Sequence, residues 1–345
     1  MRAVVVIKPN EVEIVDYPMP EIGPYEVLIQ TKVACLCNAT DGKLVAGHFP
    51  GVDQYPLMLG HESCGVVVDK GEKVRNFQIG QKALGGLVCK ELVEGVASGW
   101  GGFCEYTVAA DHDAMVADGV ADAEHGWFET CEIMRPLDDD IPFEAGALLC
   151  TWREVYGGIG DFQIKPTDDL LIFGAGPVGL SFTKFTKLMG LKYVAVVDPL
   201  EAKRKKALEM GADEVFGTEL EALKALCDKR GKKFDVIVDA VGSPKIINSA
   251  IELVRMGGTI GVYGVIADGT IPVEKFRGPY NFNLFIHQWP TRFREAAAQK
   301  PLCEWVRQGK LSADEFLSHE FPIDQITDAM DVVKRGEAIK VLLRY

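Results

Sequence analysis

The chain has 345 residues, a formal net charge of −13 and 48% hydrophobic residues. This length favours two domains, and this composition is typical of a globular protein with enough apolar residues for buried cores. The acidic balance and the lack of a basic stripe with interleaved aromatics argue against a nucleic-acid partner. No apolar run reaches the roughly 18 residues that a membrane helix needs, so we expect no membrane partner.

The first residues, MRAVVVIKPN, contain too short an apolar run for a signal peptide and favour a strand, so we expect a cytoplasmic protein. The nine cysteines are odd in number and scattered, which argues against a disulfide framework. Each is a core residue, a metal ligand or a reactive thiol, and most belong to the core. In the basic run at 203–206, we interpret Arg204, Lys205 and Lys206 as a solvated helix face.

Short β-like runs separated by Gly and Pro predict a mainly β domain in the first 110 residues. The expected strands cover residues 3–7, 27–33, 63–68 and 106–108, and Gly71 and Gly80 are the turns of a hairpin. Residues 111–140 are acidic and irregular, and a segment of that length is usually functional or disordered. A helix over residues 143–159 follows Pro142.

From Asp169 onward, strands and helices alternate, which predicts an α/β fold with a doubly wound parallel sheet. The expected strands are LLIF, YVAVVD, EVFG, FDVIVDAVG and GGTIGVYGV. The helices between the first strands end at Gly190 and Gly211. Residues 288–345 add helices and a final strand, KVLLRY.

The run Gly174-Ala175-Gly176-Pro177-Val178-Gly179 matches G-x-G-x-x-G between a strand and a helix. In this motif the first glycine permits the turn, the second admits the pyrophosphate and the third packs the helix on the strand. Free N–H groups at the helix start would face the phosphates. The motif predicts a dinucleotide site and an oxidoreductase, although a flavin or a nucleotide sugar is a rival ligand for the motif taken alone.

Asp198 ends the second strand of this unit, 19 residues after Gly179. A carboxylate there can accept hydrogen bonds from both adenosine ribose hydroxyls and repels a 2′-phosphate. The sequence therefore favours NAD over NADP.

The chain also resembles the zinc-containing medium-chain alcohol dehydrogenases, the group of sorbitol and threonine dehydrogenases. The resemblance covers almost the whole chain. It rests on Leu59-Gly60-His61-Glu62, Gly65-Val66-Val67, the glycine-rich loop and Ile339-Lys340-Val341. It implies a Rossmann NAD domain over residues 153–287 and a mainly β GroES-like catalytic domain over residues 1–152 and 288–345.

The resemblance implies a catalytic zinc ion bound by Cys37, His61 and Cys150, with Glu62 able to approach the metal. Two thiolates and an imidazole with one open position make a net-neutral centre, where zinc acidifies an alcohol that then gives hydride to the nicotinamide. Cys35 is the alternative first ligand. We prefer Cys37, because Asp41 and the preceding apolar strand fit it better.

By the same resemblance, Thr40 relays the substrate proton, and His48 could carry it to solvent, although His48 fits a surface histidine equally well. The run from Cys37 to Asp41 is one residue longer than the family pattern, which puts this loop in question. The stretch from Gly85 to Phe103 has one cysteine, Cys89, so we expect no structural zinc.

The resemblance places further side chains at the cofactor. Lys203 would reach the adenosine ribose, Lys340 the pyrophosphate, and Tyr263 and Val265 the nicotinamide. It also implies a homodimer or a homotetramer.

The substrate is not fixed by any motif. We hypothesise that the 111–140 segment covers an interdomain pocket and favours a polyol, a cyclitol or a sugar-derived alcohol over a long aliphatic one. If residues 117–133 can be deleted without changing KM, that idea fails. The polar and aromatic candidates are His125, Trp127, Glu129, Arg135, Phe276, Arg277, Tyr280 and His287, and each fits a surface residue as well.

Two alternatives remain at this point. One is a metal-free NAD(P)H-dependent quinone or enone reductase of the same superfamily, which lacks the Cys37, His61 and Cys150 set. The other is a non-catalytic NAD-sensing or structural protein, against which the full ligand set and the relay hydroxyl argue.

Overall fold

The computed structural model describes residues 1–266 and 270–345, which form two compact units. The first unit holds residues 1–151 and 299–345, and the second holds residues 152–298. No helix in the described part of the chain is long and apolar enough to cross a membrane.

The first unit is mainly β, as the sequence predicts. One sheet has the strand order β2-β1-β4-β7, and a second has the order β16-β17-β3-β5-β6-β9 with β8 paired to β3. The expected strands near residues 3, 27, 63 and 106 are all present. The bounds are β1 (Arg2–Lys8), β2 (Glu11–Asp16), β3 (Glu26–Leu36), β4 (Leu57–Met58), β5 (Ser63–Lys70), β6 (Lys82–Gly85), β7 (Ala97–Ser98), β8 (Tyr106–Ala110), β9 (Pro136–Leu137), β16 (Leu317–Pro322) and β17 (Lys340–Arg344).

Helices border these sheets, and α1 among them was not predicted. It buries Asp41 and Leu44 but has little apolar periodicity, which is the signal that sequence reasoning depends on. The helical segments of this unit are α1 (Asn38–Ala46), α2 (His112–Ala117), η1 (Ala123–His125), η2 (Glu129–Ile133), η4 (Ala313–Glu315), η5 (Ile323–Gln325) and α9 (Ile326–Lys334).

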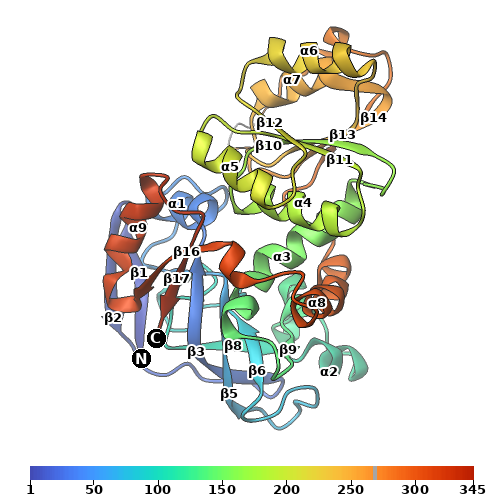
Figure 1. Ribbon diagram of the computed structural model, residues 1–345. Coiled ribbons are helices and arrows are strands. Elements are labelled where there is room, and N and C mark those ends of the chain that lie inside the picture. Colours follow the sequence, from blue (N-terminus) through green and yellow to red (C-terminus); the bar gives the residue numbers. More distant parts are fainter. Residues whose placement is uncertain (267–269) are drawn as a thin grey trace. The chain divides into compact units, whose positions relative to one another are not determined.

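The second unit is the expected doubly wound Rossmann domain. Its sheet has the parallel order β12-β11-β10-β13-β14-β15. Helices α6 and α7 cover one face and α4 and α5 the other (Figure 1). The bounds are β10 (Asp169–Phe173), α4 (Pro177–Leu188), β11 (Tyr193–Val197), α5 (Glu201–Glu209), β12 (Glu214–Phe216), α6 (Leu220–Arg230), β13 (Phe234–Asp239), α7 (Pro244–Leu253), β14 (Val254–Val262), η3 (Lys275–Arg277) and β15 (Asn283–Ile286).

The boundaries between the units fall inside two helices, α3 (Phe143–Asp161) and α8 (Arg292–Arg307). The first boundary is one residue from the expected one, whereas the second follows Ala298 rather than residue 287. The first residues of α8 belong to the second unit because they and the residue just before them form an ion pair and a hydrogen bond with Asp161 of that unit. Arg294 Nε forms an ion pair with Asp161 Oδ1 at 2.9 Å, and the Thr291 amide donates to Asp161 Oδ2.

The segment at 111–140 is more ordered than its sequence indicates. It contains α2, η1, η2 and β9 and is fastened to the turn after β5. Asp111 explains the attachment, because its carboxylate accepts hydrogen bonds from the amides of Arg75, Asn76 and Ala114. Arg75 and Asn76 are distant from Asp111 in sequence, so no local pattern announced them.

The glycine-rich turn between β10 and α4 has the geometry that its motif requires. Gly174 has a φ of +97°, which favours glycine. A Cβ at Gly179 would lie 1.8 Å from the Gly174 carbonyl oxygen, whereas one at Gly176 would meet no heavy atom within 4 Å. The third glycine therefore lets the helix pack on the turn, and the second leaves open space above the helix start.

Gly179 and Gly176 give a matched pair of variants. Gly179→Ala should lower the free energy of unfolding by about 1–3 kcal/mol, because a backbone carbonyl cannot yield to the new methyl group. Gly176→Ala should leave stability nearly unchanged and weaken NADH binding instead. Denaturant unfolding and fluorescence titration with NADH measure the two effects, and equal stability of both variants would contradict the packing role of Gly179.

Candidate metal centre and cofactor site

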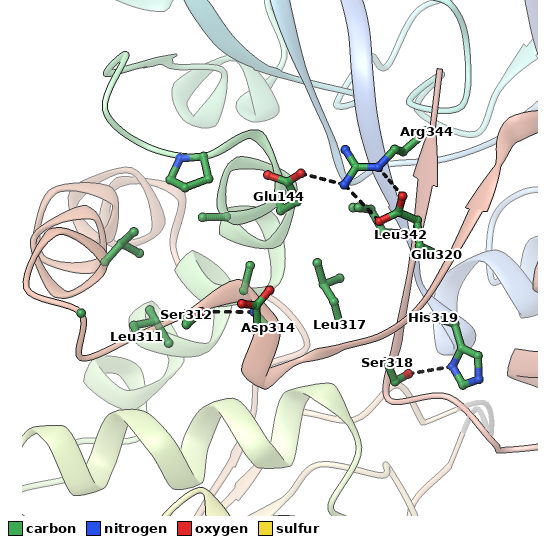
Figure 2. Close-up of a pocket in the computed structure, with 15 residues that line it drawn as sticks. Glu144, Leu311, Ser312, Asp314, Leu317, Ser318, His319, Glu320, Leu342 and Arg344 are labelled. Carbon is green, nitrogen blue, oxygen red and sulfur yellow. Dashed lines mark hydrogen bonds and ion pairs between the residues drawn. The ribbon is translucent and has the colours of Figure 1, made fainter.

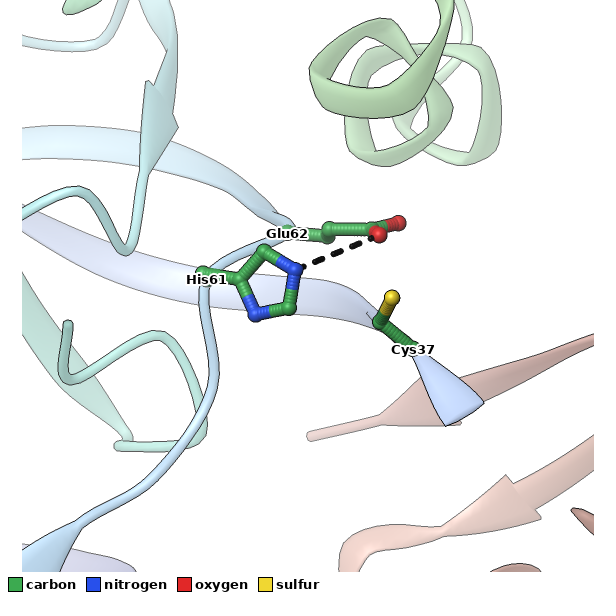
Figure 3. A group of neighbouring side chains, drawn as sticks. All are labelled: Cys37, His61 and Glu62. Atoms are coloured by element: carbon green, nitrogen blue, oxygen red, sulfur yellow. Dashed lines mark ion pairs between the residues drawn. The ribbon is translucent and has the colours of Figure 1, made fainter. Parts of the chain in front are cut away.

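Three potential metal ligands converge in the first unit. The ligand atoms of Cys37, His61 and Glu62 all lie within 4.8 Å of one another. Figure 3 shows these three side chains as neighbours. Cys37 follows β3, and His61 and Glu62 lie directly before β5. The two strands pair antiparallel near Ala34 and Ser63, which brings these two loops together.

Asp41 holds two members of this group. Its Oδ1 atom lies 3.1 Å from His61 Nδ1, and its Oδ2 atom accepts a hydrogen bond of 2.8 Å from the Cys37 amide. A carboxylate on the outer nitrogen of a metal-binding histidine fixes its ring and leaves Nε2 for the metal. The loop with the extra residue runs directly into α1, whose first turn joins the Asp41 amide to the Cys37 carbonyl oxygen.

The side chain of His61 is 13% exposed, and its partial burial by itself would lower its pKa. The Asp41 carboxylate and Cys37 outweigh this effect and raise the pKa of His61 well above its usual value. A cation is thus electrostatically favoured at this ring, whether it is a proton or a metal ion.

Glu62 has one anchored oxygen and one free oxygen. Its Oε1 atom accepts from Lys340 Nζ at 2.6 Å and from Thr151 Oγ1 at 3.0 Å. Its Oε2 atom is buried and has no hydrogen-bond partner. A buried carboxylate oxygen without a partner is costly, and a thiol, an imidazole and a carboxylate are all zinc ligands. The residues present therefore fit a zinc ion.

Lys340, expected at the cofactor pyrophosphate, is 2% exposed and forms an ion pair with Glu62. Burial would lower the pKa of this lysine, but the Glu62 carboxylate outweighs burial and raises it. The side chain is thus charged and belongs to the surroundings of the metal group. Its contact with the pyrophosphate stays a prediction.

The other two cysteine candidates lie nearby. Cys150 is buried in α3, one residue before Thr151, and is not a member of the convergent group found among the described residues. Its role as a ligand stays a prediction. Cys35 is fully buried, and burial raises the pKa of its thiol well above the usual value, so it is a poor source of thiolate. Cys37, unlike Cys35, belongs to the convergent group, which favours Cys37 as the ligand.

The two residues expected to relay a proton are on or next to α1. Thr40 is half-buried within the helix, and His48 is exposed beyond Gly47, which ends it. Sequence reasoning missed Lys43 on the same helix. Burial lowers the pKa of Lys43, and Cys37 partly opposes this effect. The ammonium group of Lys43 therefore interacts electrostatically with one member of the metal group.

Asp198, expected to bind the ribose, is buried after β11. Its Oδ2 atom accepts from the Ala175 amide at 2.8 Å and its Oδ1 atom from the Leu200 amide at 2.9 Å. Each carboxylate oxygen retains a further lone pair, so ribose hydroxyls can still donate to it.

The basic run on α5 is not wholly a solvated face. The Arg204 guanidinium donates to the carbonyl oxygens of Asp198 and Pro199 at 2.7 and 2.8 Å, which corrects our interpretation of that residue. Its location near the C-terminal end of β11 gives it carbonyls that no sequence pattern reveals. Lys203 is half-buried on the same helix.

The residues expected beside the nicotinamide follow β14. Tyr263 is buried, donates its hydroxyl to Glu154 at 3.1 Å and contacts the Phe182 ring at 5.6 Å between centroids. Val265 is half-buried. Their contact with the nicotinamide stays a prediction.

Three proposed substrate residues of the first unit bond to other residues of the 111–140 segment. Trp127 donates to His112 at 3.0 Å, Arg135 pairs with Asp113, and His125 pairs with Asp122. Glu129 begins η2. Cys89 is exposed, with its sulfur 3.3 Å from the Thr130 hydroxyl.

In the second unit, Phe276 and Tyr280 are strongly exposed, Arg277 pairs with Glu252, and His287 lies 3.7 Å from Asp161. None of these contacts identifies a ligand, and the role of each residue toward the substrate stays a prediction.

A separate hollow of about 550 Å³ lies in the first unit. Figure 2 shows Arg344 between Glu144 and Glu320 on one side and Ser318 bonded to His319 on another. No expected site residue is among its described lining residues, so it is not the predicted metal or cofactor site.

Lys340 gives a test of the buried ion pair. Lys340→Met keeps the length of the side chain but leaves Glu62 without its cation, so the free energy of unfolding should fall by about 3–5 kcal/mol. Arg335→Met breaks the exposed pair with Glu337 and should leave the free energy of unfolding nearly unchanged, because solvent screens such a pair. Urea unfolding compares the two, and similar small losses would show that the pair does not stabilise the fold. Adding Glu62→Gln to Lys340→Met should restore part of the loss.

Comparison with known proteins agrees with this arrangement. Residues 23–118 match the alcohol dehydrogenase GroES-like domain, and residues 177–287 match the zinc-binding dehydrogenase domain. The chain is 26% identical to sorbitol dehydrogenase of Bombyx mori, over 97% of this chain and 95% of that protein. It is 25% identical to L-threonine 3-dehydrogenase of Shewanella woodyi, over the full length of both.

The fold is shared with solved structures. An alcohol dehydrogenase (rspB) from Escherichia coli CFT073, complexed with NADH, superposes with a TM-score of 0.81 at 23% identity, over 100% of this chain and 99% of that one. The two domain matches and the full-length relatives confirm the resemblance that the motifs carried. The chain belongs to the zinc-containing medium-chain alcohol dehydrogenase family and is an oxidoreductase that acts on alcohols.

Proposed function

We propose that this protein transfers hydride between NAD and a secondary alcohol, most fittingly a polyol, a cyclitol or a sugar-derived alcohol, at a single zinc ion per chain. The convergence of Cys37, His61 and Glu62, with a buried and unpartnered Glu62 oxygen, carries the proposal. No structural zinc is part of it, because residues 85–103 contain one cysteine.

Zinc supplies Lewis-acid chemistry, which makes the proton of an alcohol easier to remove. Cys37, His61 and Glu62 would hold the ion, with Cys150 as a further ligand. Asp41 keeps the His61 ring oriented through Nδ1, and Lys340 with Thr151 keeps Glu62 in place. Thr40 would accept the proton of the alcohol at its hydroxyl, and His48 would pass it to solvent.

The glycine-rich turn and Asp198 support NAD as the hydride carrier. Gly174, Gly176 and Gly179 would cradle the pyrophosphate, with Pro177 and Val178 at the start of α4. Lys203, Lys340, Tyr263 and Val265 are the further contacts that the family implies. The carboxylate of Asp198 disfavours the 2′-phosphate of NADP, because the two negative charges would repel each other.

The names of the relatives support a secondary alcohol. Sorbitol and threonine both carry a secondary hydroxyl group next to a carbon that bears a polar substituent. The polar side chains of the 111–140 segment fit such a substrate better than a long aliphatic alcohol. We further infer a cytoplasmic protein that forms a homodimer or a homotetramer.

The metal-free quinone or enone reductase is the weaker candidate. A thiol, an imidazole and a buried carboxylate within 4.8 Å of one another have no role in it. The relatives compared here are alcohol and polyol dehydrogenases, which do not support that alternative.

Metal analysis tests the proposal directly. Protein purified without chelators should contain about one zinc per chain, and Cys37→Ser and His61→Ala should lose the metal together with NAD-dependent alcohol oxidation. Cys89→Ser changes an exposed cysteine and should keep both. A screen of polyols and sugars with NAD, followed by NADH absorbance, would identify the substrate. A folded, zinc-free wild type would overturn the proposal.

Asp198 tests the choice of cofactor. Asp198→Ala should raise the ratio of kcat/KM for NADP over NAD by at least about tenfold, equal to about 1.4 kcal/mol, because a repulsive charge is removed. The alanine also loses two hydrogen bonds from backbone amides, so Asp198→Asn is the matched control that retains an acceptor. An unchanged ratio in both variants would show that Asp198 does not select the cofactor.

A further inference from the structure

An aromatic side chain stands against a ligand of the proposed metal centre. The Trp100 ring lies edge-on to the His61 ring, with centroids 5.6 Å apart, and edge-on to the Phe49 ring at 5.5 Å. Phe49 is buried in the core of the first unit, whereas Trp100 is half-buried. The three rings form a continuous row that runs from the core to the metal group.

The backbone of Trp100 is held in a conformation that bulky residues avoid. Its φ is +71°, a value that glycine adopts without strain and tryptophan rarely adopts. Glycines flank it on both sides, in Gly99-Trp100-Gly101-Gly102. Two hydrogen bonds keep it there. The Trp100 amide donates to Ser98 Oγ at 3.0 Å, and its carbonyl accepts from the Val88 amide at 3.2 Å. Strain maintained in this way is characteristic of functional sites.

The loop of Trp100 is also joined to the segment that carries His61. The amides of Gly99, Gly102 and Phe103 donate to the carbonyl oxygens of Met58, Gly60 and Leu59, at 2.7, 2.6 and 2.9 Å. A Cβ at Gly102 would lie about 3 Å from the backbone of Gly60 and His61. The indole is therefore held at a fixed place relative to the metal ligand.

We propose that Trp100 determines substrate specificity, by forming an aromatic wall beside His61 against which the carbon chain of the alcohol packs. This inference rests on the proposed function, because it takes the alcohol to bind next to His61. A flat, rigid indole offers apolar contact to the C–H face of a slender polyol chain and denies space to a bulky group on the carbinol carbon. The wall thus selects narrow, chain-like secondary alcohols over branched or aromatic ones.

The test compares two alcohols in three variants. Trp100→Leu should raise kcat/KM for 1-phenylethanol relative to 2,3-butanediol by at least about tenfold, and Trp100→Phe should give a smaller change in the same direction. Trp289→Phe removes an exposed tryptophan of the second unit and should leave the ratio unchanged. If Trp100 had a purely structural role, its replacement would lower kcat/KM equally for the two alcohols and leave their ratio unchanged.

A second measurement does not depend on turnover. Cobalt(II) exchanged into the zinc site should quench tryptophan emission of the wild type and of Trp289→Phe, and Trp100→Phe should lose most of that quenching. If zinc-loaded, active Trp100→Leu keeps the wild-type ratio of the two alcohols, the inference is wrong and the proposed function stands. If the wild type binds no metal and oxidises no alcohol, the proposed function fails and the inference fails with it.

Discussion

The buried carboxylate of Glu62 is the constraint on which the metal group depends. A charge in the interior of a protein must be paired and hydrogen-bonded, or it destabilises the fold. Lys340 of β17 supplies the opposite charge and Thr151 of α3 a hydroxyl, so three segments that are far apart in sequence meet at one oxygen. The second oxygen has no partner in the described structure and is available to a cation.

The same reasoning applies to His61 and Cys37, which share Asp41. One carboxylate orients the imidazole through Nδ1 and binds the amide of the cysteine that precedes α1. The protein thus surrounds each potential ligand with a second group that fixes its direction. Such outer partners determine which metal a site accepts and how firmly it is held. Trp100 adds an apolar boundary to this otherwise polar arrangement.

Local patterns in the sequence predicted the glycine-rich turn, the alternating second unit and the strands of the first, because each depends on neighbours within a few residues. The predicted ligands Cys37 and His61 came from resemblance rather than from geometry, and the structure brings them together. Lys340 shows how much a family resemblance can predict about one residue. A resemblance gives a residue's place in the chain, whereas the burial of its side chain against Glu62 depends on the packing of β17.

The sequence by itself determined the fold class and the dinucleotide motif, since periodicity and glycine spacing are local properties, and its resemblance to a family supplied the candidate ligands. The tertiary structure decided which candidates act together. It joined Glu62 to Lys340 and Thr151, made Asp41 the shared partner of two ligands, extended α1 across the lengthened loop and placed Trp100 against His61. These contacts join residues that strand pairing and core packing bring together, and no short stretch of sequence encodes such long-range distances.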